Sequence, residues 1–339
     1  MQTFWSKSII KESNSACITA LSRERRPMNR TTKKSMVLLA GGLTVLAMWN
    51  RYLQKTIQDE DDSESKPQKV WNFRKSAIRY SCLGEGSPIL LVHDIGGNSS
   101  SIEWSESAPL LARRHKVYTI DLPGFGYSDK PVMTYTAYLF ADAIVAFIKE
   151  IIGEKTDIIA SGQSSGIALS VEKIEPDLVN KIILVNPSSP VMRQPSRGAV
   201  RALHSVYKIP VLGTFAYNLR FNRLRMEDIV PATQFYRPQN VSRKLIHAFY
   251  KNAHREESGA IAVFTSRINN MFIVPMGHFV KEAKNLSIIY GKYNLEEFPV
   301  LRRYKELNSQ ILFAPIEESR KFPQLEMPDI FAAQANAIL

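Results

Sequence analysis

The chain has 339 residues, of which 45% are hydrophobic, so it is long enough to bury a large core in one or two domains. Its two cysteines, Cys17 and Cys82, are too few for a disulfide framework or a cysteine metal site. The six histidines lack HxxxH or HxH spacing, which argues against zinc. Because a dinucleotide glycine fingerprint and a P-loop are also missing, we expect no metal and no cofactor.

The net charge of +12 is unevenly distributed along the chain. Residues 1–34 carry eight basic and two acidic side chains, whereas residues 35–65 carry two basic and five acidic ones. The body that follows is mildly basic, which suits either a plain soluble surface or an anionic partner such as lipid headgroups. Nucleic acid is not expected as a partner, since no RGG tract, RNP-like strand or recognition-helix cluster occurs.

A short apolar segment follows the basic leader of residues 1–34. Residues 36–49 form an uncharged run of 14 residues, shorter than the roughly 20 that span a bilayer comfortably. Trp49 and Tyr52 suit a membrane interface, and Arg51 can extend its charge into the headgroups. We therefore expect a single-pass anchor over residues 35–53, with a cytoplasmic N-terminus and the body across the membrane, because basic residues precede the run.

Two other interpretations of this front segment remain open. The basic, serine-containing leader resembles an organelle transit peptide, and the apolar run has the length of a cleaved secretory signal, although no A-x-A site follows it. Translation could also start at Met28. Residues 54–69, which include the acidic run DEDDSES, are expected to form a solvated linker.

The body alternates β-rich runs with amphipathic segments, which predicts an α/β fold. The expected strands lie at residues 87–93, 116–124, 156–162, 181–190, 286–291 and 310–314. Strands that are apolar throughout and separated by helices imply a mostly parallel sheet covered on both faces. The alternation stops over residues 190–283, which are helical in character. This segment is expected to form a cap between the two parts of the body, residues 70–189 and 284–339, and to shape a pocket.

One short motif in the body points to nucleophilic chemistry. The sequence GQSSG, residues 162–166, matches G-x-S-x-G between an expected strand and an expected helix. Gly162 and Gly166 would let strand and helix pass closely, and Ser164 would project its Oγ above the sheet. A tight turn without chemistry would have the same pattern.

A loop after the first buried strand of the body would complete an acyl-transfer site. It contains His93, Gly96 and Gly97, and the backbone N–H groups of Ile95 and Ser165 would bind an oxyanion. His93 is expected to bond loop backbone rather than to act as a base.

Three motifs in this order resemble the α/β-hydrolase superfamily, in its capped esterase and haloperoxidase-like branch. They are HDIGGNSSSIEW, YTIDLPGFGYSDKP and GQSSG, and the resemblance covers residues 71–338. It implies an α/β-hydrolase fold with an inserted helical cap, a pocket beneath the cap and descent from a serine hydrolase of small or lipid-derived esters.

The sequence departs from the pattern of that family at the acid and the base. Asn294 stands at the usual Asp position, Asn186 stands at the other acid position, and Lys321 stands at the usual His position. An amide supplies no charge, and a lysine near its ordinary pKa of about 10.4 is protonated at pH 7.

Substitutes for the missing groups, and a second function, therefore stay open. Lys321 could serve Ser164 as a base, His278 could reach it from the cap, and four glutamates could replace the acid. These glutamates are Glu296, Glu297, Glu317 and Glu318. The chain is thus expected to be either a serine hydrolase with a non-standard triad, or a non-catalytic relative that binds an apolar ligand or a protein partner in the capped pocket.

Overall fold

The computed structural model describes residues 30–58, 68–191, 197–294 and 298–339. The leader up to residue 29, with Cys17 and Met28, lies outside these ranges, as do the acidic run of the linker, Glu296 and Glu297. Backbone contacts divide the chain into two compact units, Met1–Ala47 and Met48–Leu339.

Helix α2, Arg30–Gln58, contains the predicted anchor. Within it, Lys34–Leu53 forms a 20-residue stretch with a mean hydropathy of 1.3. Its large apolar side chains, such as Leu38 and Val45, are exposed. By length and composition this is the one helix among the described residues that could cross a membrane, and a signal sequence would meet the same criteria.

Eight strands form one sheet in the order β1-β2-β4-β3-β5-β6-β7-β8. Their bounds are Lys69–Phe73, Ser76–Leu83, Pro88–Val92, Lys116–Ile120, Thr156–Ser161, Val179–Val185, Leu286–Gly291 and Leu312–Ile316 for β1 to β8. The strands from β4 to β8 in this order are parallel, as predicted, whereas β1 and β2 form an antiparallel hairpin that pairs with β4. The sequence analysis did not predict this hairpin as a unit.

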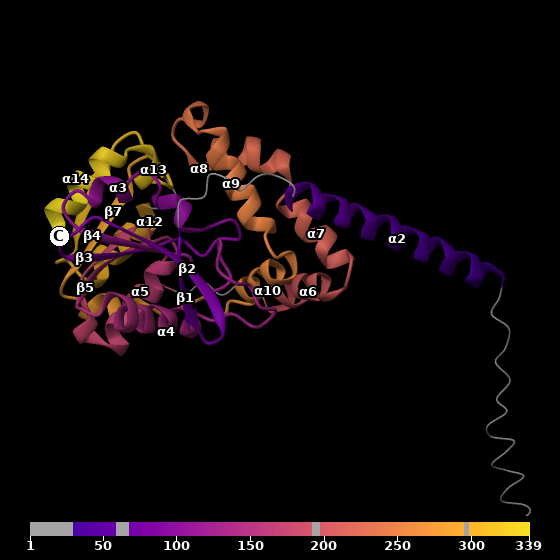
Figure 1. Ribbon diagram of the computed structural model, residues 1–339, viewed down its shortest axis with the longest axis horizontal. Helices are drawn as coiled ribbons and strands as arrows, with labels where there is room; N and C mark the ends of the chain where they lie inside the picture. Colours follow the sequence, from indigo (N-terminus) through magenta and orange to yellow (C-terminus); the bar gives the residue numbers. More distant parts are fainter. Residues whose placement is uncertain (1–29, 59–67, 192–196, 295–297) are drawn as a thin grey trace, which may run out of the picture. The chain divides into compact units, whose positions relative to one another are not determined.

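Helices cover both faces of the sheet (Figure 1), because its central strands are apolar on both sides. Helices α4, α5 and α12 pack on one face, and α3 and α14 pack on the other. Their bounds are Ala137–Phe147, Ser164–Ile174, Phe298–Leu307, Ala108–Leu111 and Pro328–Ile338, respectively. A π-helical turn, η2 (Ile148–Ile152), extends α4, and short helices η1 (Ser101–Trp104), η3 (Pro176–Leu178) and α13 (Pro323–Glu326) lie in connections.

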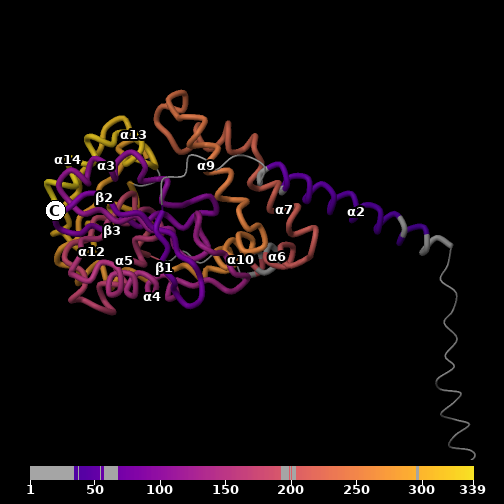
Figure 2. The backbone as a smooth tube through the Cα atoms, in the orientation of Figure 1, coloured from indigo at the N-terminus to yellow at the C-terminus, as the bar shows by residue number. Residues whose placement is uncertain are grey.

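The described part of the segment between β6 and β7 consists of helices and their connections and contains no strand. It contains α6 Arg197–Lys208, α7 Leu212–Arg220, η4 Arg225–Ile229, α8 Val230–Gln234, η5 Pro238–Asn240, α9 Arg243–His254, α10 Glu257–Ile268 and α11 Gly277–Glu282. Helices α6 to α10 gather beside the sheet (Figures 1 and 2). They have an aromatic core of their own, into which Phe322 of the body inserts against Phe235 and Phe249.

Candidate functional site

Ser164 lies in a strand–turn–helix elbow formed by β5, Gly162 and α5. Gly162 has a φ of +55°, which a glycine adopts without strain, and Ser164 is the first residue of α5. Ser164 is fully buried, and its Oγ donates a hydrogen bond to the backbone carbonyl of His93 at 2.5 Å. Among the described residues its hydroxyl has no side-chain nitrogen as a partner.

His93 is the first residue after β3, and both nitrogens of its ring are hydrogen-bonded to backbone atoms. Its Nδ1 lies 2.5 Å from the carbonyl oxygen of Asp94, and its Nε2 accepts the N–H of Leu122 at 3.0 Å. Burial lowers the pKa of His93 below its ordinary value. The imidazole therefore holds the loop in place and has no free nitrogen for Ser164.

Asp94 fills the position where the sequence predicts an oxyanion to bind. Its Oδ1 accepts the N–H of Ile95 at 2.8 Å and the N–H of Gln163 at 2.9 Å. The second predicted donor, the N–H of Ser165, bonds the carbonyl of Gly162 at 3.3 Å. Because Gln163 caps the N-terminus of α5, the positive end of that helix also faces the carboxylate. One of the two predicted oxyanion donors, the N–H of Ile95, therefore bonds a side chain of the protein, and the other bonds backbone.

Three further charged residues surround this carboxylate. Lys321 Nζ lies 3.4 Å from Asp94 Oδ2, and the Lys321 side chain remains 40% exposed. Arg267, from α10, donates its Nε hydrogen to Gln163 Oε1 at 3.0 Å. Glu103, which is buried, accepts the N–H of Asp94 at 2.6 Å. The two buried carboxylates, Asp94 and Glu103, therefore have different neighbours.

Those neighbours move the two pKa values in opposite directions. Burial alone would raise the pKa of Asp94, but Lys321, Arg267 and the two backbone N–H groups hold it below its ordinary value. Burial, and then the negative charge of Asp94, raise the pKa of Glu103 well above its ordinary value. These shifts make Asp94 the more acidic of the two buried carboxyl groups.

Lys321 is held by its backbone as well as by its side chain. Its N–H donates to the carbonyl of Gln234 in the cap, and its carbonyl accepts from Asn186 Nδ2 at 2.9 Å. Asn186 Nδ2 also bonds the carbonyl of Arg320, and its Oδ1 accepts the N–H of Gly291. Asn186 thus joins the ends of two strands to the Lys321 loop as an amide, using both its donor and its acceptor.

The other predicted residues lie in separate places. Asn294 lies in the turn after β7, where its N–H bonds the carbonyl of Gly291 at 3.1 Å. Glu317 pairs with Lys292, and Glu318 pairs with Arg237. His278 is exposed on α11 and pairs with Glu282 at 2.9 Å.

The glycines of the two loops permit close packing. A Cβ at Gly162 would lie 2.5 Å from the Asp94 carboxyl carbon, and one at Gly166 would lie 2.9 Å from Val274. At Gly97 it would lie 2.4 Å from the ring of Phe221, a cap residue, and at Gly96 it would lie 2.9 Å from Ser99 Oγ. The first contact explains why the elbow tolerates the Asp94 carboxylate.

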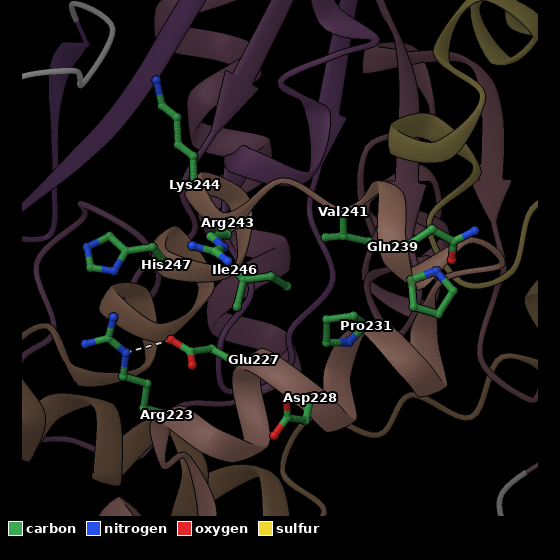
Figure 3. Close-up of a pocket in the computed structure, with 11 residues that line it drawn as sticks. Arg223, Glu227, Asp228, Pro231, Gln239, Val241, Arg243, Lys244, Ile246 and His247 are labelled. Carbon is green, nitrogen blue, oxygen red and sulfur yellow. Dashed lines mark hydrogen bonds and ion pairs between the residues drawn. The ribbon is translucent and has the colours of Figure 1, made fainter.

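A cavity of about 960 Å³ lies in the cap, and its lining residues come from positions 223–247 (Figure 3). Arg223 pairs there with Glu227 at 2.6 Å, and Lys244 and His247 add basic groups. Neither Ser164 nor Ile95 lines this cavity, so it is not the pocket over the elbow that the sequence predicts. Within the described part of the chain, no group of three or more His, Cys, Asp or Glu side chains could hold a metal ion.

The sequence analysis did not single out Asp94, Glu103 or Arg267. Asp94 could have been noticed, because a carboxylate next to Ile95 and two glycines can accept the backbone N–H groups that the sequence analysis assigned to an oxyanion. Glu103 lies only nine residues after Asp94, within the quoted motif HDIGGNSSSIEW, but nothing in that motif indicates that its carboxylate turns back to the N–H of Asp94. Arg267 comes from the cap, and only folding brings it to this site.

Comparisons with known proteins bear on the family and the fold of the chain. Residues 89–286 match the profile of the alpha/beta hydrolase family. A 2-hydroxy-6-oxo-6-(2'-aminophenyl)hexa-2,4-dienoic acid hydrolase from Metapseudomonas resinovorans is 30% identical over 143 residues, covering 41% of this chain and 49% of that protein. Protein ABHD8 from Homo sapiens is 28% identical over 121 residues, covering 34% of this chain and 27% of that protein. The chain thus spans about half or less of the curated relatives' length.

Solved structures resemble the chain over a larger part of its length. A serine hydrolase of carbazole degradation, CarC, covers 81% of this chain and 98% of its own, with a TM-score of 0.66 and 20% identity. A bacterial membrane phospholipase A covers 92% and 98%, with a TM-score of 0.62 and 18% identity. At these identities the likeness establishes the fold. Together with the profile match over more than half of its residues, it shows that the chain belongs to the alpha/beta hydrolase family.

Proposed function

We propose that the chain is a membrane-anchored, non-catalytic member of this family, descended from a serine hydrolase and acting through binding rather than ester turnover. The single observation that carries the proposal is the Asp94 carboxylate, which accepts the N–H of Ile95. An oxyanion cannot use a donor that a buried carboxylate already occupies, and a second negative charge beside Asp94 would be repelled.

The surroundings of Ser164 support the same proposal. Its hydroxyl donates to a backbone carbonyl, and Lys321 is paired with Asp94 and not hydrogen-bonded to Ser164. A hydrolase of this type needs a base that takes the serine proton and donors that hold the oxyanion. Loss of triad groups lowers kcat by roughly 10⁴–10⁶-fold.

The membrane part of the proposal is supported by the apolar stretch Lys34–Leu53 of α2. The basic residues before it favour a cytoplasmic N-terminus. Extraction of cell membranes with alkaline carbonate tests this part, because an integral chain stays in the pellet and a cleaved or peripheral one is released.

Labelling with a fluorophosphonate probe tests the catalytic part. We expect the folded full chain to react no more than its Ser164→Ala variant, and to hydrolyse p-nitrophenyl butyrate no faster than that variant. Labelling that depends on Ser164, together with ester turnover by the unmodified chain, would overturn the proposal.

A rebuilt site supplies the positive control. The variant Asp94→Gly, Asn294→Asp, Lys321→His clears the oxyanion loop and provides an acid and a base at the positions that the family uses. We expect Ser164-dependent labelling to appear in this variant, and a thermal melt establishes that it is folded.

A Ser–Lys hydrolase is the second candidate, because Lys321 Nζ reaches Asp94, which lies against the elbow. A Ser–Lys hydrolase predicts that the unmodified chain is labelled and that Lys321→Met abolishes labelling. Lys321→Arg should abolish it as well, because arginine keeps the charge but cannot deprotonate. The non-catalytic proposal predicts no labelling in any of the three proteins.

A further inference from the structure

The first part of the cap has an unusual charge composition. Residues 197–226 contain six basic residues and no acidic residue. The basic residues are Arg197, Arg201, Lys208, Arg220, Arg223 and Arg225. Such a segment attracts anionic surfaces from several ångströms away, within the Debye length.

The same part of the cap exposes large aliphatic side chains. Leu219 is 62% exposed and Leu224 is 73% exposed, and smaller exposures recur along the segment at Val206, Ile209, Leu212 and Ile229. We call residues 206–229 the basic–aliphatic face. The face also contains Glu227, which pairs with Arg223, and Asp228, so its basic residues outnumber its acidic ones without being free of them. Exposed aliphatic groups next to an excess of basic groups are typical of proteins that lie on a bilayer surface.

Two arginines of this face repel one another. Burial, followed by the positive charge of Arg225, lowers the pKa of Arg220 below its ordinary value. Among the described carboxylates, none forms an ion pair with Arg220 or Arg225. An anionic headgroup would relieve this crowding, because phosphate accepts hydrogen bonds from guanidinium groups on several sides.

The face is also hydrogen-bonded to the end of the candidate membrane span. Asn50, which is buried and belongs to the same compact unit as the cap, donates its Nδ2 hydrogen to the carbonyl of Val211 at 3.1 Å. Its Oδ1 accepts from Asn218 Nδ2 of α7 at 3.3 Å. Asn50 lies three residues before Leu53, the last residue of the candidate span, so α7 is hydrogen-bonded close to the end of that stretch.

We propose that the basic–aliphatic face docks on the headgroup layer of an anionic bilayer, with Leu219 and Leu224 inserted and Arg220 and Arg225 on lipid phosphates. The docking rests on the anchoring proposed above. A bilayer is favoured over a protein partner because the face adjoins the span and because its contacts need charge and apolar area without a specific shape.

Site-directed spin labelling tests the docking in the full chain. The chain carries Cys17→Ser and Cys82→Ser, with a nitroxide on Leu224→Cys, and is reconstituted in phosphatidylcholine vesicles with or without phosphatidylglycerol. In the anionic vesicles we expect collisions with oxygen to increase severalfold relative to collisions with a water-soluble nickel complex. Addition of Arg220→Glu and Arg225→Glu should reverse this shift.

Two controls match these variants. Tyr138, on α4, is 68% exposed, and a nitroxide on Tyr138→Cys should stay accessible to nickel in every vesicle. Arg113→Glu with Arg114→Glu makes the same change of charge at exposed positions outside the cap and should leave the Leu224 label unchanged.

The possible outcomes separate the two proposals. Release of the chain from the vesicles by alkaline carbonate would overturn the anchoring and the docking with it. A retained chain whose Leu224 label is as water-exposed as the Tyr138 label would overturn the docking alone. A label shielded from both oxygen and nickel would indicate a protein cover and would also overturn it.

Discussion

The turn that carries Ser164 and the loop that follows β3 lie against each other, yet their side chains suit them to different chemistry. The turn has the glycines, the strand–turn–helix path and the serine of a nucleophile elbow. The loop places the Asp94 carboxylate against its own N–H at Ile95 and against the N–H of Gln163 in the turn. The comparison shows that a backbone can keep its path while a single side chain, here Asp94, determines which group its N–H donors bind.

The largest expected effect comes from Gly162, where the two loops touch. Gly162→Ala should lower the free energy of unfolding by about 3 kcal/mol, because the added Cβ meets the Asp94 carboxylate and φ is positive. Gly153→Ala is a matched control, since its φ is +76° but nothing lies within 4 Å of the added Cβ. It should cost about 1 kcal/mol. Equal losses in urea unfolding would show that Asp94 does not press against the elbow.

Asn186 tests whether the acid position of the family still accepts an acid. Asn186→Asp removes the donor that bonds the carbonyls of Arg320 and Lys321 and turns a carboxylate oxygen toward them. We expect a loss of about 2 kcal/mol in urea unfolding and no gain in ester hydrolysis. Asn72→Asp, at an exposed position of β1, should be nearly neutral. A stable, active Asn186→Asp variant would contradict the structural role.

The two buried carboxyl groups, Asp94 and Glu103, are expected to change the stability of the chain with pH in opposite directions. Because the pKa of Glu103 is raised in the folded chain, its stabilisation is complete below the unfolded pKa of about 4.3 and is lost as pH rises through the folded pKa. Asp94, whose pKa is lowered, has the opposite sign and loses stabilisation as pH falls.

Glu103→Gln should therefore gain stability relative to the unmodified chain from about pH 5 upward, and the gain should level off above the folded pKa at about 1.4 kcal/mol for each unit of raised pKa. Urea unfolding across this range measures the gain. Parallel curves for the two proteins would mean that Glu103 titrates at its ordinary pKa.

The smallest expected effect is at Arg267, a cap residue whose Nε donates a hydrogen bond to Gln163 of the elbow. Arg267→Met removes the hydrogen bond to Gln163 and a positive charge near Asp94. A partly exposed contact of this kind contributes about 0.5–1 kcal/mol. Arg267→Lys keeps the charge and should recover part of the loss, whereas identical stabilities for both variants would rule out the charge as its source.

The elements that the sequence predicts well are those specified by neighbours in the chain. The apolar runs of β3, β5 and β6, and the glycines around Ser164, determine their own local structure. The hairpin of β1 and β2 was not predicted, because its partners are distant in the chain: Trp71 packs on Phe147 of α4, and β2 pairs with β4. The alternation of strands and helices contains no information about such a pairing.

The charges of the site could be predicted only in part. The substitutions Asn294 and Lys321 are visible in the sequence, but the partner of Lys321 is not, since Asp94 lies more than two hundred residues away. The amide of Asn186 was noted only for lacking a charge, whereas the structure gives it three hydrogen bonds. Its role depends on where two distant loops meet.

The ring of Phe221, which directly follows α7 of the cap, packs against Gly97, three residues from Asp94. The ring lies where any side chain at position 97 would stand, one loop turn from Asp94. If α7 moves outward, the ring leaves a hollow that water can fill, and hydration of Asp94 and Glu103 would follow. A bilayer that holds α7 would thus also set how wet the buried carboxylates are.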